Sequence, residues 1–204
     1  MEWELPAAPP QESKEGEDPL APTHSARSPE TAPSFFSNAR AAACVGSSML
    51  HVRPVSLLSE SYTISAKKKG RALTTVSIRW FREAGSFSLD GQTFDLGREG
   101  WMGGDFFLSI GRRELASADK PSAWHRRFTV RADGTKYVLQ ARSAFSRKFD
   151  LLRGRRKVGS IEPTSIWTRG ATADLPAELP LELRVFMIWL ALLLWKRARD
   201  SSSS

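Results

Sequence analysis

The chain has 204 residues, of which 41% are hydrophobic and 25% are charged. This composition excludes both a polytopic membrane protein and a fully disordered chain, and the length fits one ordinary domain with a tail. The 30 Lys and Arg residues outnumber the 22 Asp and Glu residues, and the net charge of +8 favours acidic partners such as lipid headgroups or nucleic acid. A single cysteine, Cys44, excludes an internal disulfide framework and is typical of a reducing compartment.

Residues 1–50 are predicted to form a disordered tail rich in Pro, Glu and Ser. Residues 1–40 hold seven of the twelve prolines and carry seven acids against three bases, so this segment has a net charge of −4 and the rest of the chain +12. Such a stretch buries too little apolar surface to offset its chain entropy. Its acidic, Pro-rich start does not fit a secretory signal, and Met49 is an alternative start of the chain. The basic character therefore belongs to a folded domain predicted at residues 51–199, followed by a serine tail at 200–204.

From Ser61 onward, short runs with alternating apolar residues predict antiparallel strands. Asp90 and Gly91, and likewise Asp133 and Gly134, are typical of tight hairpin turns, and Gly154 indicates a third. The glycine-rich stretch 97–104 is predicted to be an irregular loop. The nine predicted strands are 61–66, 74–80, 86–89, 92–96, 106–110, 127–130, 137–141, 148–152 and 157–161.

The segment 185–195 consists of eleven consecutive apolar residues and predicts a helix from about residue 179 to 198. Pro180 and Glu182 suit its start, and Lys196 and Arg197 suit its end. A helix without a polar face must be surrounded by protein or by lipid. The side chains predicted to form its buried core are Val185, Phe186, Ile188, Trp189, Leu192, Leu193 and Trp195.

Length favours protein over lipid as the surroundings of this helix. About 20 residues are needed to cross the hydrocarbon core of a bilayer, whereas eleven span only about 16 Å. Strands of five or six residues have a matching height of about 17 to 20 Å. We therefore predict an antiparallel β-barrel that encloses the C-terminal helix. The alternative is a tail-anchored single-pass membrane protein with a small β-domain.

The segment 149–161 has an apolar strand, a basic Gly-containing turn and the sequence Val-Gly-Ser-Ile, and a hydrophobic helix follows it near the C-terminus. This pattern, over about residues 62–197, resembles the tubby-like superfamily, which includes the tubby C-terminal domain, phospholipid scramblases and LURP-one-related proteins. The resemblance implies a twelve-stranded barrel around a C-terminal helix. The nine strands predicted here leave two alternatives, a smaller barrel or strands without a clear signal. The cysteine-rich and calcium-binding features of scramblases are absent from the sequence, and no local motif matches the tubby phosphoinositide site.

No catalytic constellation is evident in the sequence. The three histidines (His24, His51 near the linker and His125 at a strand start) form no metal-spaced pair, and Cys44 has no nearby histidine. Asp174 is predicted to lie in the turn before the helix. We therefore predict no catalytic residue, no metal site and no cofactor.

Basic clusters at predicted turns and strand ends suggest a function, because their positive charge would attract anionic partners. A rim of solvated charges that only keeps the protein soluble would produce the same pattern. They occur at 67–71, 112–113, 126–127, 147–148, 153–157 and 196–199. If the hairpin ends converge, their charges would bind anionic headgroups. The predicted lipid- or anion-binding residues are Arg153, Arg155, Arg156, Lys157, Arg147 and Lys148. We expect a non-catalytic, cytoplasmic protein that binds anionic phospholipid at a membrane surface, with nucleic acid as the competing partner.

Overall fold

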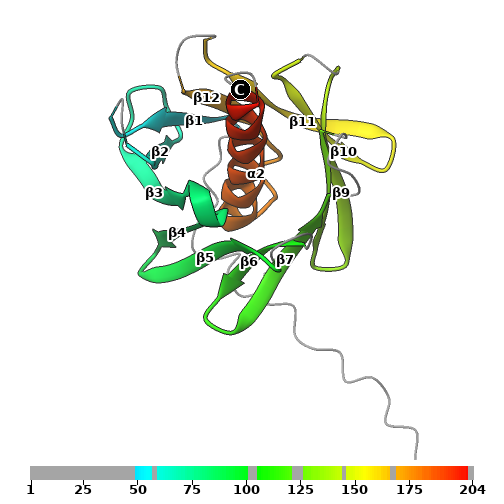
Figure 1. The fold of residues 1–204 in the computed structure, drawn as a ribbon, viewed down its shortest axis with the longest axis horizontal. Helices are drawn as coiled ribbons and strands as arrows, with labels where there is room; N and C mark the ends of the chain where they lie inside the picture. Colours follow the sequence, from blue (N-terminus) through cyan, green and yellow to red (C-terminus); the bar gives the residue numbers. More distant parts are fainter. Residues whose placement is uncertain are drawn as a thin grey trace, which may run out of the picture. The chain divides into compact units, whose positions relative to one another are not determined.

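Across the described residues, the computed structural model contains twelve antiparallel strands that close into a barrel around one long helix (Figure 1). The structure describes residues 49–56, 59–100, 105–120, 126–143, 146–165 and 169–201, all within one compact unit, Ser34–Ser204. The elements are β1 (Met49–Pro54), β2 (Ser61–Ser65), β3 (Ala72–Arg79), a 3-10 helix η1 (Trp80–Arg82), β4 (Ala84–Leu89), β5 (Gln92–Arg98), β6 (Phe106–Ile110), β7 (Arg113–Asp119), β8 (Arg127–Ala132), β9 (Thr135–Ala141), β10 (Phe149–Arg153), β11 (Arg156–Pro163), β12 (Ala171–Asp174) and α2 (Leu181–Asp200).

The barrel is a meander in which each strand pairs with its neighbours in sequence, and the pairing of β1 with β12 closes it. In this closing pair, which we call the seam, His51 lies opposite Thr172 and Val52 opposite Ala171. Because successive strands are antiparallel, the connections alternate between two ends of the barrel. The hairpins β2–β3, β4–β5, β6–β7, β8–β9 and β10–β11 share the end at which α2 begins, which we call the hairpin end. The opposite end, where α2 finishes, is the mouth end.

The predicted hairpins are confirmed. Asp90 and Gly91 connect β4 to β5 with φ values of 48° and 78°. Asp133 and Gly134 connect β8 to β9 with φ values of 46° and 68°, and Gly154, at 62°, lies in the β10–β11 turn. Both central residues of the two Asp-Gly turns therefore have the left-handed backbone that suits the twist of a two-residue hairpin.

Nine of the twelve strands coincide with predicted ones, and β1, β7 and β12 were missed. The strands β7 and β12 contain alanines, which have little strand preference. Ala116 and Ala118 of β7, and Ala171 and Ala173 of β12, are all buried. Ala118 pairs with Phe106 of β6, which reaches the helix, so small residues alternate with large ones around the interior. The choice between a smaller barrel and missed strands is thus settled in favour of missed strands.

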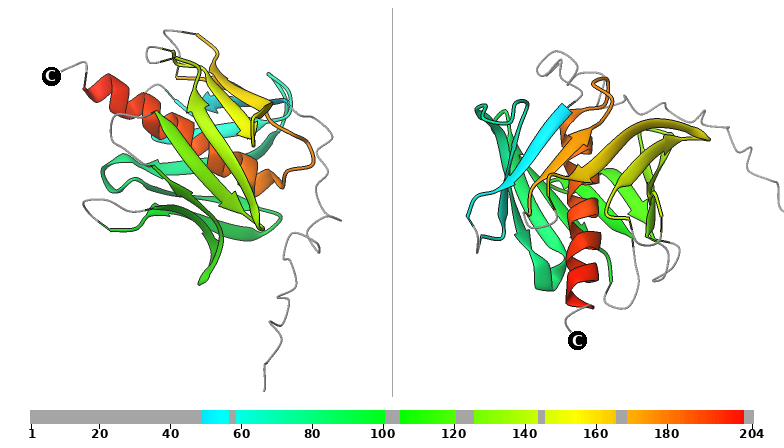
Figure 2. Two further views of the ribbon diagram at one scale, coloured as in Figure 1. Left: turned by 90° about the vertical axis from the view of Figure 1, so that its right-hand side faces the viewer. Right: turned by 90° about the horizontal axis from the view of Figure 1, so that it is seen from above.

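The helix α2 occupies the barrel interior, and its C-terminal end extends beyond the strands (Figures 1 and 2). A helix with side chains is about 10 to 12 Å across, and a barrel wider than the eight-stranded type has room for it. Trp189, which is 0% exposed, packs edge-on against Phe106 at 5.8 Å and stacks on Phe186 at 6.0 Å. All seven predicted core residues of the helix are buried: Val185, Phe186, Ile188, Trp189, Leu192, Leu193 and Trp195.

Some sequence predictions differ from the structure or fall outside the described residues. The strand β1 begins at Met49, two residues before the predicted domain boundary at residue 51, and Asp174 ends β12 instead of lying in a turn. Gly97 lies within β5, where a Cβ would come within 2.4 Å of the Phe107 ring, so the predicted loop begins later than residue 97. The predictions for residues 1–48, 101–104, 121–125 and 202–204 concern residues that the structure does not describe. Over the ranges that it does describe, no helix has both the length and the apolarity needed to cross a membrane.

Candidate functional site

The six predicted anion-binding residues lie in three different environments. Lys148 and Lys157 lie on the outer wall of the barrel, where their ammonium groups contact Glu162 at 2.9 Å and Asp150 at 2.8 Å. Arg142 bridges the same two carboxylates, at 3.0 Å from Asp150 and 3.2 Å from Glu162. The hydrogen bond from Arg142 lowers the pKa of Asp150, and the one from Lys148 lowers the pKa of Glu162. Lys148 and Lys157 are therefore neutralised by acidic neighbours.

Arg147 belongs to the packing of the helix end. Its carbonyl oxygen accepts a hydrogen bond from the indole Nε1 of Trp195 at 2.8 Å, and its guanidinium lies 5.8 Å from the centre of the Trp195 ring. Arg147 precedes β10 and Arg153 ends it, so the two residues lie at opposite ends of the barrel. The six residues therefore do not converge into one patch.

Arg153, Arg155 and Arg156 remain as the predicted residues with available charge. They surround Gly154 at the β10–β11 turn and are exposed. Among the described residues, none of the three has an ion-pair partner. A hairpin tip that extends three arginines into solvent can bring all three charges to one planar surface.

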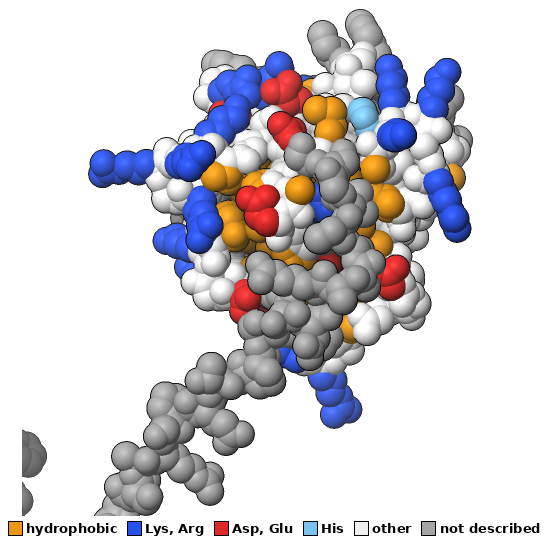
Figure 3. Space-filling model, turned by 180° about the vertical axis from the view of Figure 1, so that it is seen from behind, with side chains coloured by type: hydrophobic (Ala, Val, Ile, Leu, Met, Phe, Trp, Pro, Cys, Tyr) orange, Lys and Arg blue, Asp and Glu red, His pale blue; other side chains and the backbone are white. Residues whose placement is uncertain are grey.

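The topology adds further bases at the hairpin end. Exposed bases in the connecting turns of the other hairpins, also without an ion-pair partner in the described part of the chain, are Lys67, Lys68, Lys69, Arg71 and Arg112. Asp90 and Asp133 are exposed acids at the turns between them. Seen from behind, Lys and Arg side chains project around the rim of the molecule, with hydrophobic side chains inside the rim (Figure 3). We call the following set of residues the basic rim: Lys67, Lys68, Lys69, Arg71, Arg112, Arg153, Arg155 and Arg156.

The bases near the end of α2 have a structural role instead. The carboxylate of Glu83, which follows η1, forms ion pairs with Arg98 at 2.9 Å and with Arg197 at 2.5 Å. These ion pairs link strand β5 to the helix. Burial lowers the pKa of Lys120, and the positive charge of Arg197 lowers it further. This network fixes the helix end at the mouth of the barrel.

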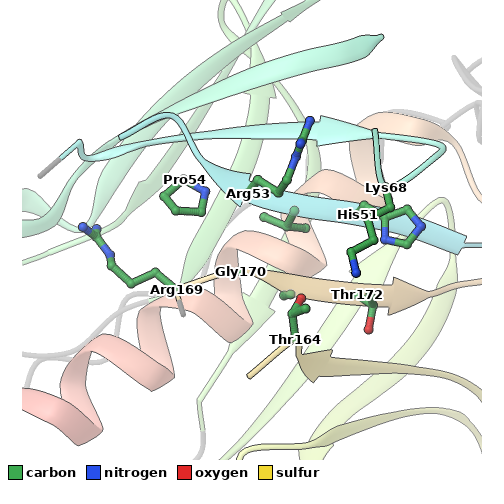
Figure 4. Close-up of a pocket in the computed structure, with 10 residues that line it drawn as sticks. His51, Arg53, Pro54, Lys68, Thr164, Arg169, Gly170 and Thr172 are labelled. Atoms are coloured by element: carbon green, nitrogen blue, oxygen red, sulfur yellow. The ribbon is translucent and has the colours of Figure 1, made fainter. Parts of the chain in front are cut away.

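A cleft of about 590 Å³ lies across the seam (Figure 4). Its described lining residues are His51, Val52, Arg53, Pro54, Lys68, Thr164, Arg169, Gly170, Ala171 and Thr172. His51, predicted near a linker, is part of β1. The sequence does not indicate this cleft, because its described walls come from β1, the β2–β3 hairpin and β12, and neither strand of the seam was predicted.

A second cleft of about 340 Å³ lies near the C-terminal end of the helix, and its walls carry charges of both signs. Its described lining residues are Glu60, Trp80, Arg169, Lys196, Arg199 and Asp200. Lys196 and Asp200 already pair with each other across one helical turn at 2.5 Å. This cleft therefore has a weaker preference for the charge of a ligand than the seam cleft.

Among the described residues, no group of three or more His, Cys, Asp and Glu side chains is arranged to hold a metal ion. Comparison of the chain with protein-family models, with curated proteins and with solved structures finds no match.

Proposed function

We propose that this chain is a non-catalytic binding protein of the tubby-like type, and that its basic rim holds it at the cytoplasmic surface of membranes that contain anionic lipid. The assignment to this type rests on the sequence pattern together with a closed twelve-stranded barrel that encloses a C-terminal helix. The membrane role rests on one observation: the bases of the basic rim share the hairpin end and have no ion-pair partner among the described residues, whereas Lys148 and Lys157 on the wall are neutralised.

The strength of such an attraction follows from the number of bases that reach the surface. Each Lys or Arg close to an anionic membrane contributes about 1 kcal/mol, and the attraction falls off within a Debye length of about 8 to 10 Å. Arg153, Arg155 and Arg156 together would contribute about 3 kcal/mol, which is on the order of a hundredfold in membrane partitioning. Because the contribution is electrostatic, it is expected to decline steeply as salt is raised.

Co-sedimentation with vesicles tests this proposal. We expect the protein to pellet with vesicles of phosphatidylcholine plus phosphatidylserine, to remain in the supernatant with phosphatidylcholine alone, and to be released by high salt. The variant Arg153→Glu/Arg155→Glu/Arg156→Glu should lose the binding. Equal pelleting on neutral and anionic vesicles would overturn the proposal.

A matched control separates the basic rim from overall charge. Arg79, Arg82 and Arg127 are exposed arginines at the mouth end without an ion-pair partner in the described ranges. Replacing all three by Glu changes the net charge by the same amount as the hairpin variant. We expect this control to retain vesicle binding, and an equal loss in the two triple variants would contradict a role specific to the hairpin end. Tighter binding to duplex DNA than to anionic vesicles, at the same salt, would favour nucleic acid as the partner.

A further inference from the structure

The short helix η1 presents a fully exposed aromatic side chain at the mouth end. It connects β3 to β4 and has the sequence Trp80-Phe81-Arg82 (Figure 1). Phe81 is 102% exposed, more than any other large hydrophobic residue that the structure describes. Val55, at 57%, comes next, and it follows β1 at the same end of the barrel. Single exposed apolar side chains are common on protein surfaces, so a functional role for Phe81 depends on its surroundings.

The backbone on both sides of Phe81 is anchored to the barrel. The ring of Trp80 packs edge-on against Tyr62 at 6.3 Å, and Tyr62 is 1% exposed. Glu83 ends η1 in the left-handed conformation, with φ at 46°, and its amide donates a hydrogen bond to the Trp80 carbonyl at 3.2 Å. The Glu83 carboxylate is fixed in turn by its ion pairs with β5 and α2. A partner that covers the Phe81 ring therefore has little backbone entropy to remove.

Positive charge flanks the exposed ring in the chain. Arg79 and Arg82 lie on either side of Trp80 and Phe81, and both are exposed. Neither arginine has an ion-pair partner over the ranges that the structure describes. Aromatic residues and Arg are the residue types that contribute most to binding at protein interfaces. A complementary surface would carry carboxylates around an apolar centre.

The surface beside η1 fits a protein better than a bilayer. Trp80 also lines the second cleft, of about 340 Å³, and the exposed carboxylate of Glu60 lies on the same cleft near Lys196. An anionic bilayer would be repelled by Glu60, whereas a protein can place a base there. The eight residues of β3 also separate η1 from the hairpin end by about 26 Å of strand, more than twice the Debye length. A membrane at the basic rim therefore does not reach Phe81.

We propose that η1 and the second cleft form a docking site for a protein segment in which carboxylates flank a large apolar side chain. The apolar side chain covers the Phe81 ring, and the carboxylates pair with Arg79 and Arg82. The polar part of the segment continues into the cleft, where residues of both charge signs are available. This role goes beyond the proposed membrane role, because a barrel held at its hairpin end turns its mouth end away from the bilayer and can hold a partner at the same time.

Selection of short random peptides displayed on phage tests the chemistry of the partner. The whole protein is the bait, at physiological salt and with excess polyglutamate, which removes peptides that are held by charge alone. We expect the enriched peptides to carry Asp or Glu on both sides of a large apolar residue. Failure to enrich any peptide, or enrichment of peptides without acidic residues, would overturn the proposal.

Fluorescence anisotropy with a labelled synthetic peptide from this selection tests the location. Phe81→Ala should weaken binding at least about thirtyfold, which is the effect of truncating a central interface residue. Arg79→Glu/Arg82→Glu should weaken it at least about tenfold. Two matched controls should stay within about twofold of the unmodified protein: Met49→Ala, which truncates a 42% exposed residue at the hairpin end, and Arg127→Glu, which changes an exposed arginine five strands away around the mouth. Equal effects of Phe81→Ala and Met49→Ala would refute a site at η1.

Vesicle pelleting separates a protein partner from a bilayer. Phe81→Ala should pellet with vesicles of phosphatidylcholine plus phosphatidylserine as the unmodified protein does. Loss of pelleting in this variant would assign Phe81 to a membrane contact and overturn the proposal. Arg153→Glu/Arg155→Glu/Arg156→Glu should keep its affinity for the peptide. If the unmodified protein does not pellet but the peptide results hold, the membrane proposal alone fails.

Discussion

Trp189 offers the sharpest test of how the helix stabilises the barrel. It is fully buried and contacts Phe106 of β6 and Phe186 on its own helix through ring pairs at 5.8 and 6.0 Å. Truncating a buried Trp to Ala costs about 3 to 5 kcal/mol, and each lost ring pair accounts for about 0.5 to 1.5 kcal/mol of such energies. Domains of this size unfold with about 5 to 15 kcal/mol, so Trp189→Ala should remove a large share of the stability.

Urea unfolding followed by circular dichroism measures this change, with the free energy extrapolated to water. Phe81→Ala is the matched aromatic control, because Phe81 is 102% exposed and its truncation should change the free energy of unfolding by less than about 0.5 kcal/mol. Similar losses of unfolding free energy in Trp189→Ala and Phe81→Ala would show that burial of Trp189 in the barrel does not stabilise the fold.

Two conservative variants separate packing from hydrogen bonding in the helix. Among the described residues, the buried Nε1 of Trp189 has no hydrogen-bond partner, whereas that of Trp195 donates to the Arg147 carbonyl. Trp195→Phe therefore loses a hydrogen bond worth about 0.5 to 1.5 kcal/mol in addition to packing. Trp189→Phe should lose packing alone.

Three further predictions concern charge and close packing. The pKa values of Asp150 and Glu162 are lowered in the folded state, so the ionised carboxylates stabilise the fold. This contribution to the free energy of unfolding is complete above the unfolded pKa values of about 3.9 and 4.3, and it is lost as the pH falls through the folded values. Asp150→Asn/Glu162→Gln should therefore flatten this part of a curve of unfolding free energy against pH. Burial raises the pKa of Glu182, which opposes folding above that pKa, so Glu182→Gln should raise the free energy of unfolding at pH 7, with the gain vanishing below about pH 4. Gly159→Ala places a Cβ 2.6 Å from a backbone carbonyl of β12 and should cost about 1 to 3 kcal/mol in thermal or urea unfolding, whereas Gly97→Ala meets a movable phenylalanine ring and should cost less.

Local signals made much of the fold predictable. Asp90 and Gly91 identify a hairpin because few other residue pairs adopt two consecutive positive φ values. The uninterrupted apolar run at 185–195 identifies a buried helix, because it is too short to cross the hydrocarbon core of a bilayer but matches the height of the strands of a barrel. The alanine-containing strands β7 and β12 were not predicted from the sequence. Their small buried side chains leave room for large helix side chains such as Trp189, and this requirement cannot be read from the strands alone.

The candidate site was predictable only in part. Arg153, Arg155 and Arg156 were recognisable because a basic turn remains exposed whichever way the strands pair. The neutralisation of Lys148 by Glu162 was not, because these residues meet only across the ladder of β10 and β11. The seam cleft depends on contact between the first and last strands of the barrel, and such long-range pairing leaves no periodic trace in the sequence.

In this fold the barrel itself shields the apolar helix α2 from water. Native-state hydrogen exchange of the amides of residues 184–195, which follow the unpaired first turn of α2, is measured as urea is raised in small steps. If the barrel encloses the helix, these amides should exchange only through global unfolding, with a free energy equal to that of the most protected strand amides. Exchange of the helix amides at a much lower free energy, while the strands stay protected, would show that the helix opens to water without the barrel unfolding.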